Sequence, residues 1–292
     1  MRNLINKANI TSEDLKRIKL IAIDVDDTLL NDEKRISEEN IKIIKEISDL
    51  GVKVVIASGR PLSSVTNDIY KELGLYNKDN YFIAYNGACI YEVVSEKVVY
   101  SNKLKKEDVL FIDNFFESIK NKSARYVHLD ENVTVINPNE YSDIEYKYNN
   151  KPCIEGEYLE IPNLKCYKYQ VADDPEEIKK LYSLIPKEIK QKYNVMITMP
   201  CFIEFIKKEV NKYEAIKNLC NVLEIKNDEV MAIGDSMNDY EMVKKSGIGV
   251  AMGNAINEIK EVAKIITKNN QENGVFYAIN LIKNTKKNIK KI

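Results

Sequence analysis

The chain has 292 residues, which is enough for about two domains and a substantial hydrophobic core. Its 44 Lys and Arg residues nearly balance 45 Asp and Glu residues, so charge gives no reason to expect a nucleic acid or an anionic membrane as a partner. The sequence shows neither a signal peptide nor an apolar run long enough to span a bilayer, so we expect a cytoplasmic protein that acts on a small molecule. The five cysteines form no C-x-x-C motif, which argues against a disulfide framework or a structural zinc site.

Buried strands and amphipathic helices alternate in the first third of the chain. Apolar runs without polar alternation are typical of strands that are buried on both faces of a parallel sheet. The predicted elements are, in order, a helix with a capping box at Thr11 within residues 1–18, a strand within 19–30, a helix after Ser37 that ends at Gly51, a strand at 52–57, a helix from Pro61 and a strand at 81–85. This βαβαβ order predicts a parallel sheet with right-handed crossovers.

The hydropathy pattern of the sequence changes between residues 89 and 205. Segments 124–129 and 164–171 alternate polar and apolar residues, as half-exposed strands of a mostly antiparallel sheet do, and helices are expected near 105–120 and 174–192. His128, the only histidine, is interpreted as a polar residue of one of these strands. We therefore predict a separate α+β domain inserted at 89–205.

Parallel-sheet texture then resumes to the end of the chain. A helix is expected after Asn211, followed by buried strands at 229–233, 247–252 and 264–267. The sequence thus predicts an α/β fold in which residues 1–88 and 206–292 form a parallel-sheet core.

Acidic and small polar side chains follow three of the predicted core strands. These residues are Asp24 and Asp26 after the first strand, Ser58 after the second, and Asp235 with Asp239 after the fourth. Because ligands bind outside the carboxyl ends of parallel strands, we expect these side chains to converge on one crevice, with those of Asp24 and Asp26 on the same side. Carboxylates packed together repel one another, so a cation is expected among them. Oxygen ligands without His or Cys favour Mg²⁺ over zinc, and Mg²⁺ in turn suggests a phosphate substrate.

The order of these motifs resembles the haloacid dehalogenase superfamily of phosphohydrolases. D-x-D-x-T at 24–28, S-G-R at 58–60, a late lysine and G-D-x-x-N-D at 234–239 occur in that order. The insertion, N-G-A at 86–88 and G-V-A-M-G-N-A at 249–255 resemble the Cof-type branch, which carries a C2B cap. The resemblance implies a Rossmann-like core and a cap that sets substrate choice.

Roles for individual residues are likewise implied by this resemblance. Asp24 would be the nucleophile that forms an aspartyl-phosphate, and Asp26 would protonate the leaving group and then activate water. Neighbouring anions are expected to keep the Asp26 carboxyl protonated. The implied Mg²⁺ ligands are Asp24, the Asp26 backbone carbonyl and Asp235, with Asp239 as a ligand or a supporting residue.

The phosphoryl group would be held by a second set of residues. This set consists of Ser58 with the amides of Ser58 and Gly59 at a helix start, Lys212, which also orients Asp24, and Asn238. Asn254 and Asn270 match family positions near the phosphate and the metal. The chain departs from the family pattern at Asp27, where Gly is usual and an extra carboxylate would alter metal affinity, at Glu209 and Tyr213 beside Lys212, and at Asn273.

Three functions remain open from the sequence. The first is a magnesium-dependent phosphatase acting on small phosphorylated metabolites such as sugar phosphates, phosphorylated cofactors or nucleotides. The second is a phosphosugar mutase of a related capped branch, which returns the phosphate to a sugar. The third is a non-catalytic phosphate-binding module on the same fold. A monomer or a homodimer is expected for each.

Overall fold

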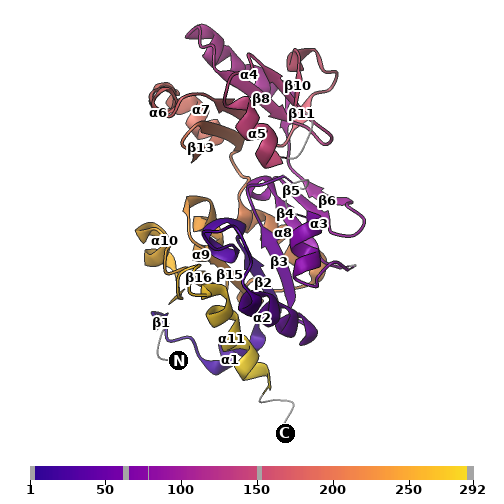
Figure 1. Cartoon of the computed structure of the whole chain (residues 1–292), viewed down its shortest axis with the longest axis vertical. Coiled ribbons are helices and arrows are strands. Elements are labelled where there is room, and N and C mark those ends of the chain that lie inside the picture. The colour runs from indigo at the N-terminus through magenta and orange to yellow at the C-terminus, as the bar shows by residue number, and fades with distance from the viewer. Residues whose placement is uncertain (1–3, 62–65, 78, 150–152, 288–292) are drawn as a thin grey trace. The chain divides into compact units, whose positions relative to one another are not determined.

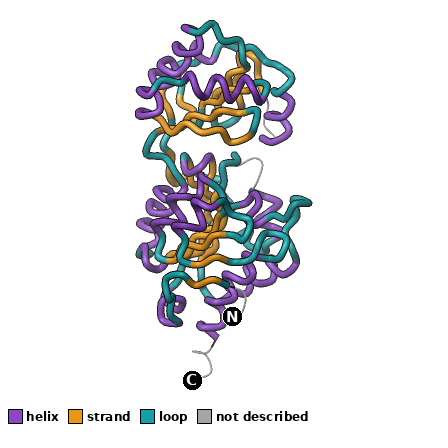
Figure 2. The backbone as a smooth tube through the Cα atoms, turned by 90° about the vertical axis from the view of Figure 1, so that its left-hand side faces the viewer, coloured by secondary structure: helices purple, strands orange, loops and turns teal. Residues whose placement is uncertain are grey.

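Two stretches that are distant in the sequence form the first unit of the structure, residues 1–100 and 211–292, and residues 101–210 form the second (Figure 1). The computed structural model describes residues 4–61, 66–77, 79–149 and 153–287. In both units the strands lie in the interior and helices flank them (Figure 2).

Unit 1 is built around a nine-stranded sheet. Its strands, in spatial order, are β1 (Ile5–Asn6), β17 (Ile265–Ile266), β16 (Ile248–Ala251), β15 (Val230–Gly234), β2 (Leu20–Ile23), β3 (Lys53–Ala57), β4 (Tyr81–Ala84), β5 (Cys89–Glu92) and β6 (Val98–Ser101). The six strands from β17 to β4 run parallel, whereas β1 pairs antiparallel with β17 and β5 pairs antiparallel with β4. The predicted α/β class with a parallel core sheet is confirmed.

The central strand β2 explains where a ligand site can form. All four of its residues are buried between β15 and β3, as its uninterrupted apolar run predicts. The chain proceeds from β2 to β3 and β4 on one side, and later from β15 to β16 and β17 on the other. Such a reversal opens a crevice at the carboxyl ends of β2 and β15.

Helices cover both faces of this sheet. The helices of unit 1 are α1 (Ser12–Arg17), α2 (Glu38–Asp49), α3 (Thr66–Glu72), α8 (Lys212–Leu223), α9 (Tyr240–Lys245), α10 (Asn257–Val262) and α11 (Gly274–Lys287). The predicted capping box at Thr11 is present, Ser37 caps α2, and Gly51 follows α2 with φ +85°. The start of the helix expected from Pro61 falls on residues 62–65, which lie outside the described residues.

Unit 2 has a smaller sheet of its own. Its six strands, in spatial order, are β10 (Cys153–Glu155), β9 (Val133–Ile136), β8 (Ala124–His128), β12 (Tyr169–Ala172), β14 (Phe202–Lys207) and β13 (Tyr193–Met199). A separate pair joins β7 (Leu104–Lys105) to β11 (Lys165–Cys166). The helices are α4 (Lys106–Ser118), α5 (Ser142–Asn149), α6 (Pro175–Leu184) and α7 (Lys187–Lys192). The strands pair antiparallel except for β9 and β10, so this unit combines helices with a mostly antiparallel sheet.

Several sequence-based boundaries differ from the structure. The insertion was expected to begin at residue 89, but β5 pairs with β4 and β6 follows it in the core sheet, and unit 1 extends to residue 100. Its end was expected at residue 205, but β14 continues to Lys207. The strand expected at 164–171 is two strands, β11 and β12, and the helix expected at 174–192 is interrupted at Pro186. Helix α5 was not expected.

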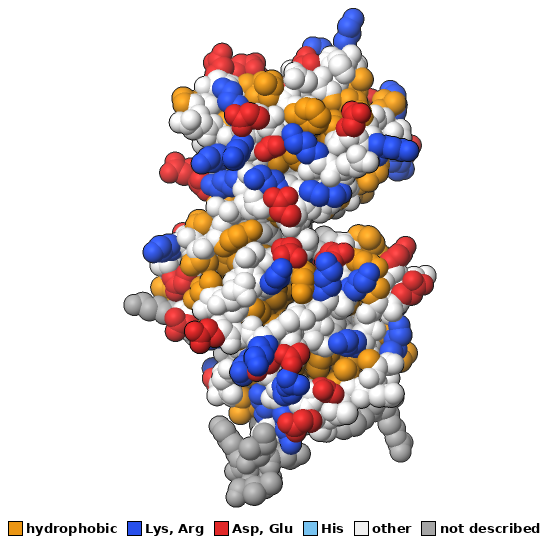
Figure 3. Space-filling view, turned by 180° about the vertical axis from the view of Figure 1, so that it is seen from behind, with side chains coloured by type: hydrophobic (Ala, Val, Ile, Leu, Met, Phe, Trp, Pro, Cys, Tyr) orange, Lys and Arg blue, Asp and Glu red, His pale blue; other side chains and the backbone are white. Residues whose placement is uncertain are grey.

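Among the described residues, every helix is too short or too polar to cross a bilayer. Lys and Arg side chains lie among Asp and Glu side chains on the face shown in Figure 3.

Candidate active site

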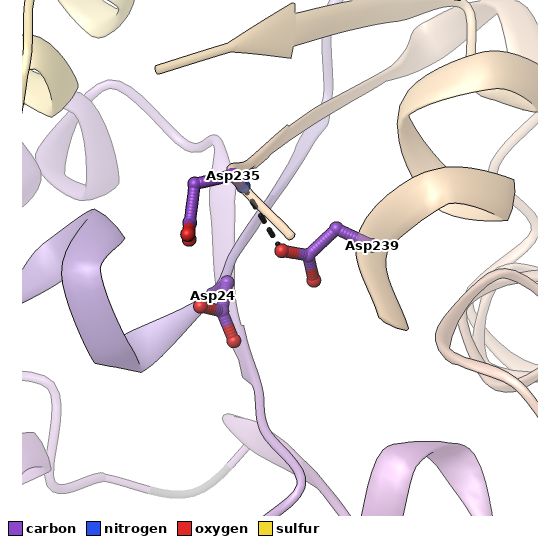
Figure 4. Close-up of side chains that lie close together, drawn as sticks. All are labelled: Asp24, Asp235 and Asp239. Atoms are coloured by element: carbon purple, nitrogen blue, oxygen red, sulfur yellow. Dashed lines mark hydrogen bonds between the residues drawn. The ribbon is translucent and has the colours of Figure 1, made fainter. Parts of the chain in front are cut away.

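Three carboxylates meet at the carboxyl ends of β2 and β15. Asp24 directly follows β2, and its backbone amide continues the sheet by donating to Ile233 O at 3.1 Å. Asp235 and Asp239 belong to the loop that follows β15. One ligand atom from each of Asp24, Asp235 and Asp239 lies within 4.8 Å of the others, and all three residues are buried (Figure 4).

The loop after β15 is folded around the Asp239 carboxylate. Asp239 Oδ2 accepts hydrogen bonds from the backbone amides of Asp235, at 3.0 Å, and Ser236, at 3.2 Å. A Cβ on Gly234 would lie 2.5 Å from the Asp239 carboxyl carbon, so only glycine fits there. The carboxylate of Asp239 therefore shapes the loop that presents Asp235.

Lys212 connects the acids to a third part of the chain. It is the first residue of α8, is fully buried, and follows the helix cap Asn211. Its Nζ donates to Asp24 Oδ1 at 2.5 Å and to Asp239 Oδ1 at 2.6 Å. Gly87, with φ +103°, packs against the same helix start, because a Cβ there would lie 2.3 Å from Asn211 O.

Burial and mutual repulsion change the protonation of these groups. Burial, together with the Asp239 carboxylate, raises the pKa of Asp24 well above its ordinary value despite the nearby Lys212. Burial and Asp239 also raise the pKa of Asp235 to about 7, although Thr28 donates a hydrogen bond to it. Burial alone would lower the pKa of Lys212, but Asp239 and Asp24 outweigh burial and raise it.

The charges of this cluster fit a divalent cation. With all groups ionised, three carboxylates and one ammonium leave a net charge of −2 in a buried site. The donors are carboxylate oxygens, which are hard ligands suited to Mg²⁺ or a similar ion. An Asp cluster that can bind a divalent metal is thus present.

Asp26 has different surroundings from those expected. It lies in a turn with φ −76° and ψ 129°, and its carboxylate lies outside the Asp24, Asp235 and Asp239 cluster. Arg60 donates to both of its oxygens, from Nε to Oδ2 at 2.9 Å and from Nη2 to Oδ1 at 2.5 Å. The turn faces Asp26 toward the S-G-R loop, so this carboxylate binds a cation that the sequence did not predict.

Comparison with known proteins identifies this arrangement. A family model described as haloacid dehalogenase-like hydrolase matches residues 21–279. The chain belongs to this family. A relative in Bacillus subtilis, 5-amino-6-(5-phospho-D-ribitylamino)uracil phosphatase YcsE, is 34% identical over 90% of this chain and 94% of its own. The expectations of the family and of an HAD-like hydrolase are confirmed.

Solved structures agree with this membership of the haloacid dehalogenase-like hydrolases. One, a haloacid dehalogenase-like hydrolase from Bacteroides thetaiotaomicron, has a TM-score of 0.79 and 30% identity, covering 91% of this chain and 99% of that one. Another, the HAD subclass IIB sugar phosphatase BT4131, has a TM-score of 0.75 and 26% identity, covering 90% of this chain and 98% of that one.

Several residues expected to hold a phosphoryl group already bond to other protein groups in this hydrolase. Ser58 is buried, but its backbone amide donates to Ile83 O at 2.9 Å, so the expected role for that amide is wrong: the strand ladder already uses it. Its Oγ accepts from the Arg60 amide at 3.1 Å. Gly59 packs against the Asn86 side chain, and Asn238 Nδ2 donates to Asn86 Oδ1 at 3.0 Å. Asn86 thus joins two loops of the predicted phosphate site.

Two asparagines of this hydrolase support the loop after Asp26. Asn254 Nδ2 donates to Asp27 O at 2.7 Å, and Asn270 Nδ2 donates to Leu30 O at 3.3 Å. The side chains of Asn254 and Asn270 therefore bind backbone carbonyls of this loop. Asp27, where the chain departs from the family pattern, has a partner of its own. Its carboxylate accepts from Lys34 at 3.1 Å and lies outside the acidic cluster.

The other departures from the family pattern leave the buried cluster intact. Glu209 accepts from Asn102 Nδ2 at 3.1 Å within unit 2, and Lys245 Nζ lies over the Tyr213 ring. Asn273 has φ +60° just before α11. Lys212 therefore reaches Asp24 without the glycines expected around it.

Two residues that contact the expected site carboxylates, Thr28 and Arg60, received no role from sequence reasoning. Thr28 donates to Asp235 Oδ1 at 2.7 Å, and Arg60 fixes Asp26. Thr28 belongs to the D-x-D-x-T motif and Arg60 to the S-G-R motif. Their positions in these two motifs were the signal from which a role could have been predicted.

Proposed function

We propose that this hydrolase is a magnesium-dependent phosphatase that hydrolyses small phosphomonoesters through an aspartyl-phosphate on Asp24. The observation that carries the proposal is the buried group of Asp24, Asp235 and Asp239 with Lys212 bonded to Asp24. Support also comes from similar proteins, one of which is named for a phosphorylated ribitylamino-uracil and another as a sugar phosphatase. We extend that substrate class, small phosphorylated metabolites, to this chain.

The metal would be held by the carboxylates of Asp24 and Asp235 and by the backbone carbonyl of Asp26. Asp239 would support the site without binding the metal itself, since its oxygens already accept from Lys212 and from two backbone amides. When bound, Mg²⁺ supplies positive charge that stabilises the phosphoryl oxygens and the ionised acids.

Asp24 would attack the phosphorus atom. A bond forms between a carboxylate oxygen of Asp24 and phosphorus, while the bond from phosphorus to the ester oxygen breaks with its electron pair on the leaving alcohol. Lys212 fixes the direction of the Asp24 carboxylate through its 2.5 Å hydrogen bond. Water then attacks the phosphorus of the aspartyl-phosphate, which frees Asp24 and releases inorganic phosphate.

Asp26 would move the protons in both halves of the reaction. It gives a proton to the leaving oxygen and later accepts one from the attacking water. Arg60 binds both carboxylate oxygens and so holds the side chain in one orientation. The hydroxyl of Ser58 and the side chains of Lys212 and Asn238, with Gly59, would complete the phosphoryl site.

We further propose that unit 1 is the catalytic core and that unit 2 is the cap that selects substrates. A cytoplasmic location and a monomeric or homodimeric state also stay predictions, which rest on the sequence.

Hydrolysis of p-nitrophenyl phosphate and a panel of phosphomonoesters tests the proposal. We expect turnover with Mg²⁺ that disappears after treatment with EDTA and returns when Mg²⁺ is added back. An Asp26→Asn variant should lose turnover of alkyl phosphates while keeping phosphate binding, since only proton transfer is removed. Metal-independent turnover, or no turnover across the panel, would contradict the proposal, and an isomerised phosphosugar in place of free phosphate would favour a mutase.

A further inference from the structure

A second cation lies beside Asp26, on a loop that the mechanism above does not use. Lys34 Nζ is 3.9 Å from Asp26 Oδ1 and 3.1 Å from Asp27 Oδ1. Arg60 contacts the same Asp26 carboxylate from the S-G-R loop. The carboxyl group that would serve the leaving group is therefore flanked by two cations.

The backbone holds Lys34 in this place. Asp27 and Lys34 both have φ +57°, in the left-handed region that residues other than glycine rarely adopt. Three contacts keep the loop in this shape: a bridge between Leu30 and Ile36, the bond from Lys34 N to Asn31 O at 2.9 Å, and the bond from Asn254 to Asp27 O. The side chains of Asp27 and Lys34 therefore form an ion pair beside Asp26.

Lys34 is also the more accessible of the two cations. Its side chain is 54% exposed and that of Asp27 is 55% exposed, whereas Arg60 is 24% exposed. Ion pairs between exposed side chains are weak, so an anion on a ligand can replace Asp27 as the partner of Lys34 at little cost.

We propose that Lys34, positioned by Asp27, is a specificity residue that binds an anionic group on the leaving portion of the substrate. This inference rests on the proposed function and narrows it. A leaving oxygen within hydrogen-bond reach of Asp26 Oδ1 lies no more than about 7 Å from Lys34 Nζ, given the 3.9 Å between Lys34 Nζ and Oδ1 and a bond of about 3 Å. The substrates are therefore phosphomonoesters that carry a carboxylate or a second phosphate a few bonds from the scissile ester.

Two matched pairs of substrates test this assignment with the full-length, Mg²⁺-loaded protein. In each pair, 2-phosphoglycerate with glycerol 2-phosphate and 3-phosphoglycerate with glycerol 3-phosphate, the molecules differ by a carboxylate in place of a hydroxymethyl group. We expect the wild type to prefer the phosphoglycerates. Lys34→Met should lower kcat/KM for the phosphoglycerates about 10-fold, mainly through KM, and change the glycerol phosphates less than about 2-fold.

Further variants separate a specific role from a general one. Lys34→Arg should keep the preference. Lys34→Met leaves the Asp27 charge to repel the substrate carboxylate, so adding Asp27→Asn to Lys34→Met should restore part of the loss. Lys217→Met removes an exposed lysine of α8 that pairs with Glu214 of the same helix. This variant is the matched control and should change neither series.

The outcomes distinguish this inference from the proposed function. An equal loss on both substrate series, or no wild-type preference for the phosphoglycerates, would overturn the role of Lys34 and leave the phosphatase assignment in place. Failure of the wild type to hydrolyse any phosphomonoester would instead overturn the proposed function.

Discussion

Both units bury charged side chains, and one cluster of unit 1 differs in its balance from the Arg125 and Asp113 pair of unit 2. In unit 2, Arg125 on β8 bonds to Asp113 of α4 at 3.1 Å, and the hydroxyls of Tyr158 and Tyr169 donate to the same Asp113 oxygen. This pair is neutral, and one oxygen of Asp113 accepts all three hydrogen bonds. In unit 1, Asp24, Asp235 and Asp239 face one lysine. An uncompensated buried charge is costly, so its presence indicates a ligand rather than a structural pair.

The largest expected effect is on turnover, in the unbalanced cluster. Asp24→Asn should lower phosphatase activity by about 10⁴-fold or more, because the nucleophile is lost while the shape is kept. The same change removes one of the repelling charges, so the melting temperature of the metal-free protein should stay the same or rise. Steady-state kinetics and thermal unfolding in EDTA check both parts. A clear drop in melting temperature would place Asp24 among structural charges, as in unit 2.

The opposite result is expected in the balanced cluster. Arg125→Met leaves Asp113 buried without its cation and should lower the free energy of unfolding by about 3–5 kcal/mol. Chemical denaturation followed by circular dichroism measures this loss. Glu117 also accepts from Arg125 but is 58% exposed, so Glu117→Gln is the matched control and should cost less than about 1 kcal/mol. Similar losses for both variants would contradict the contrast drawn here.

The smallest effect concerns pH in the absence of metal. The pKa of Asp235 is about 7 in the folded protein against an ordinary 3.8, so folding favours its protonated form. The stability that this group contributes is present below about pH 4 and is lost as pH rises toward 7. We therefore expect the melting temperature in EDTA to include a decline over this range that Asp235→Asn reduces and that saturating Mg²⁺ abolishes. A wild type and an Asp235→Asn variant with the same pH profile in EDTA would contradict this explanation.

Much of the core was predictable because its strands are buried on both faces. The run from Leu20 to Ile23 and the acids at 24, 235 and 239 follow a regular rule, that parallel strands deliver side chains to one edge. Strands β5 and β6 were expected in the insertion, because the sequence does not show that β5 pairs back onto β4.

The partners of individual charges were less predictable. Sequence order cannot tell which cation will meet Asp26, since Arg60 is distant in the chain and reaches it only through the turn after β2. Helix α5 was missed because the segment 142–149 has only a weak apolar periodicity, and packing against the sheet decides its structure.

The close contact of Gly87 with Asn211 has a consequence for how such proteins diversify. Both residues belong to unit 1, and the contact fixes the start of α8 at the point where the chain returns from residues 101–210. We therefore expect changes within that long segment to leave the Lys212 ammonium in place. Grafting a foreign insert into this scaffold should succeed when both joints lie between Gly87 and Asn211, so that both residues are kept, and should fail when either is replaced.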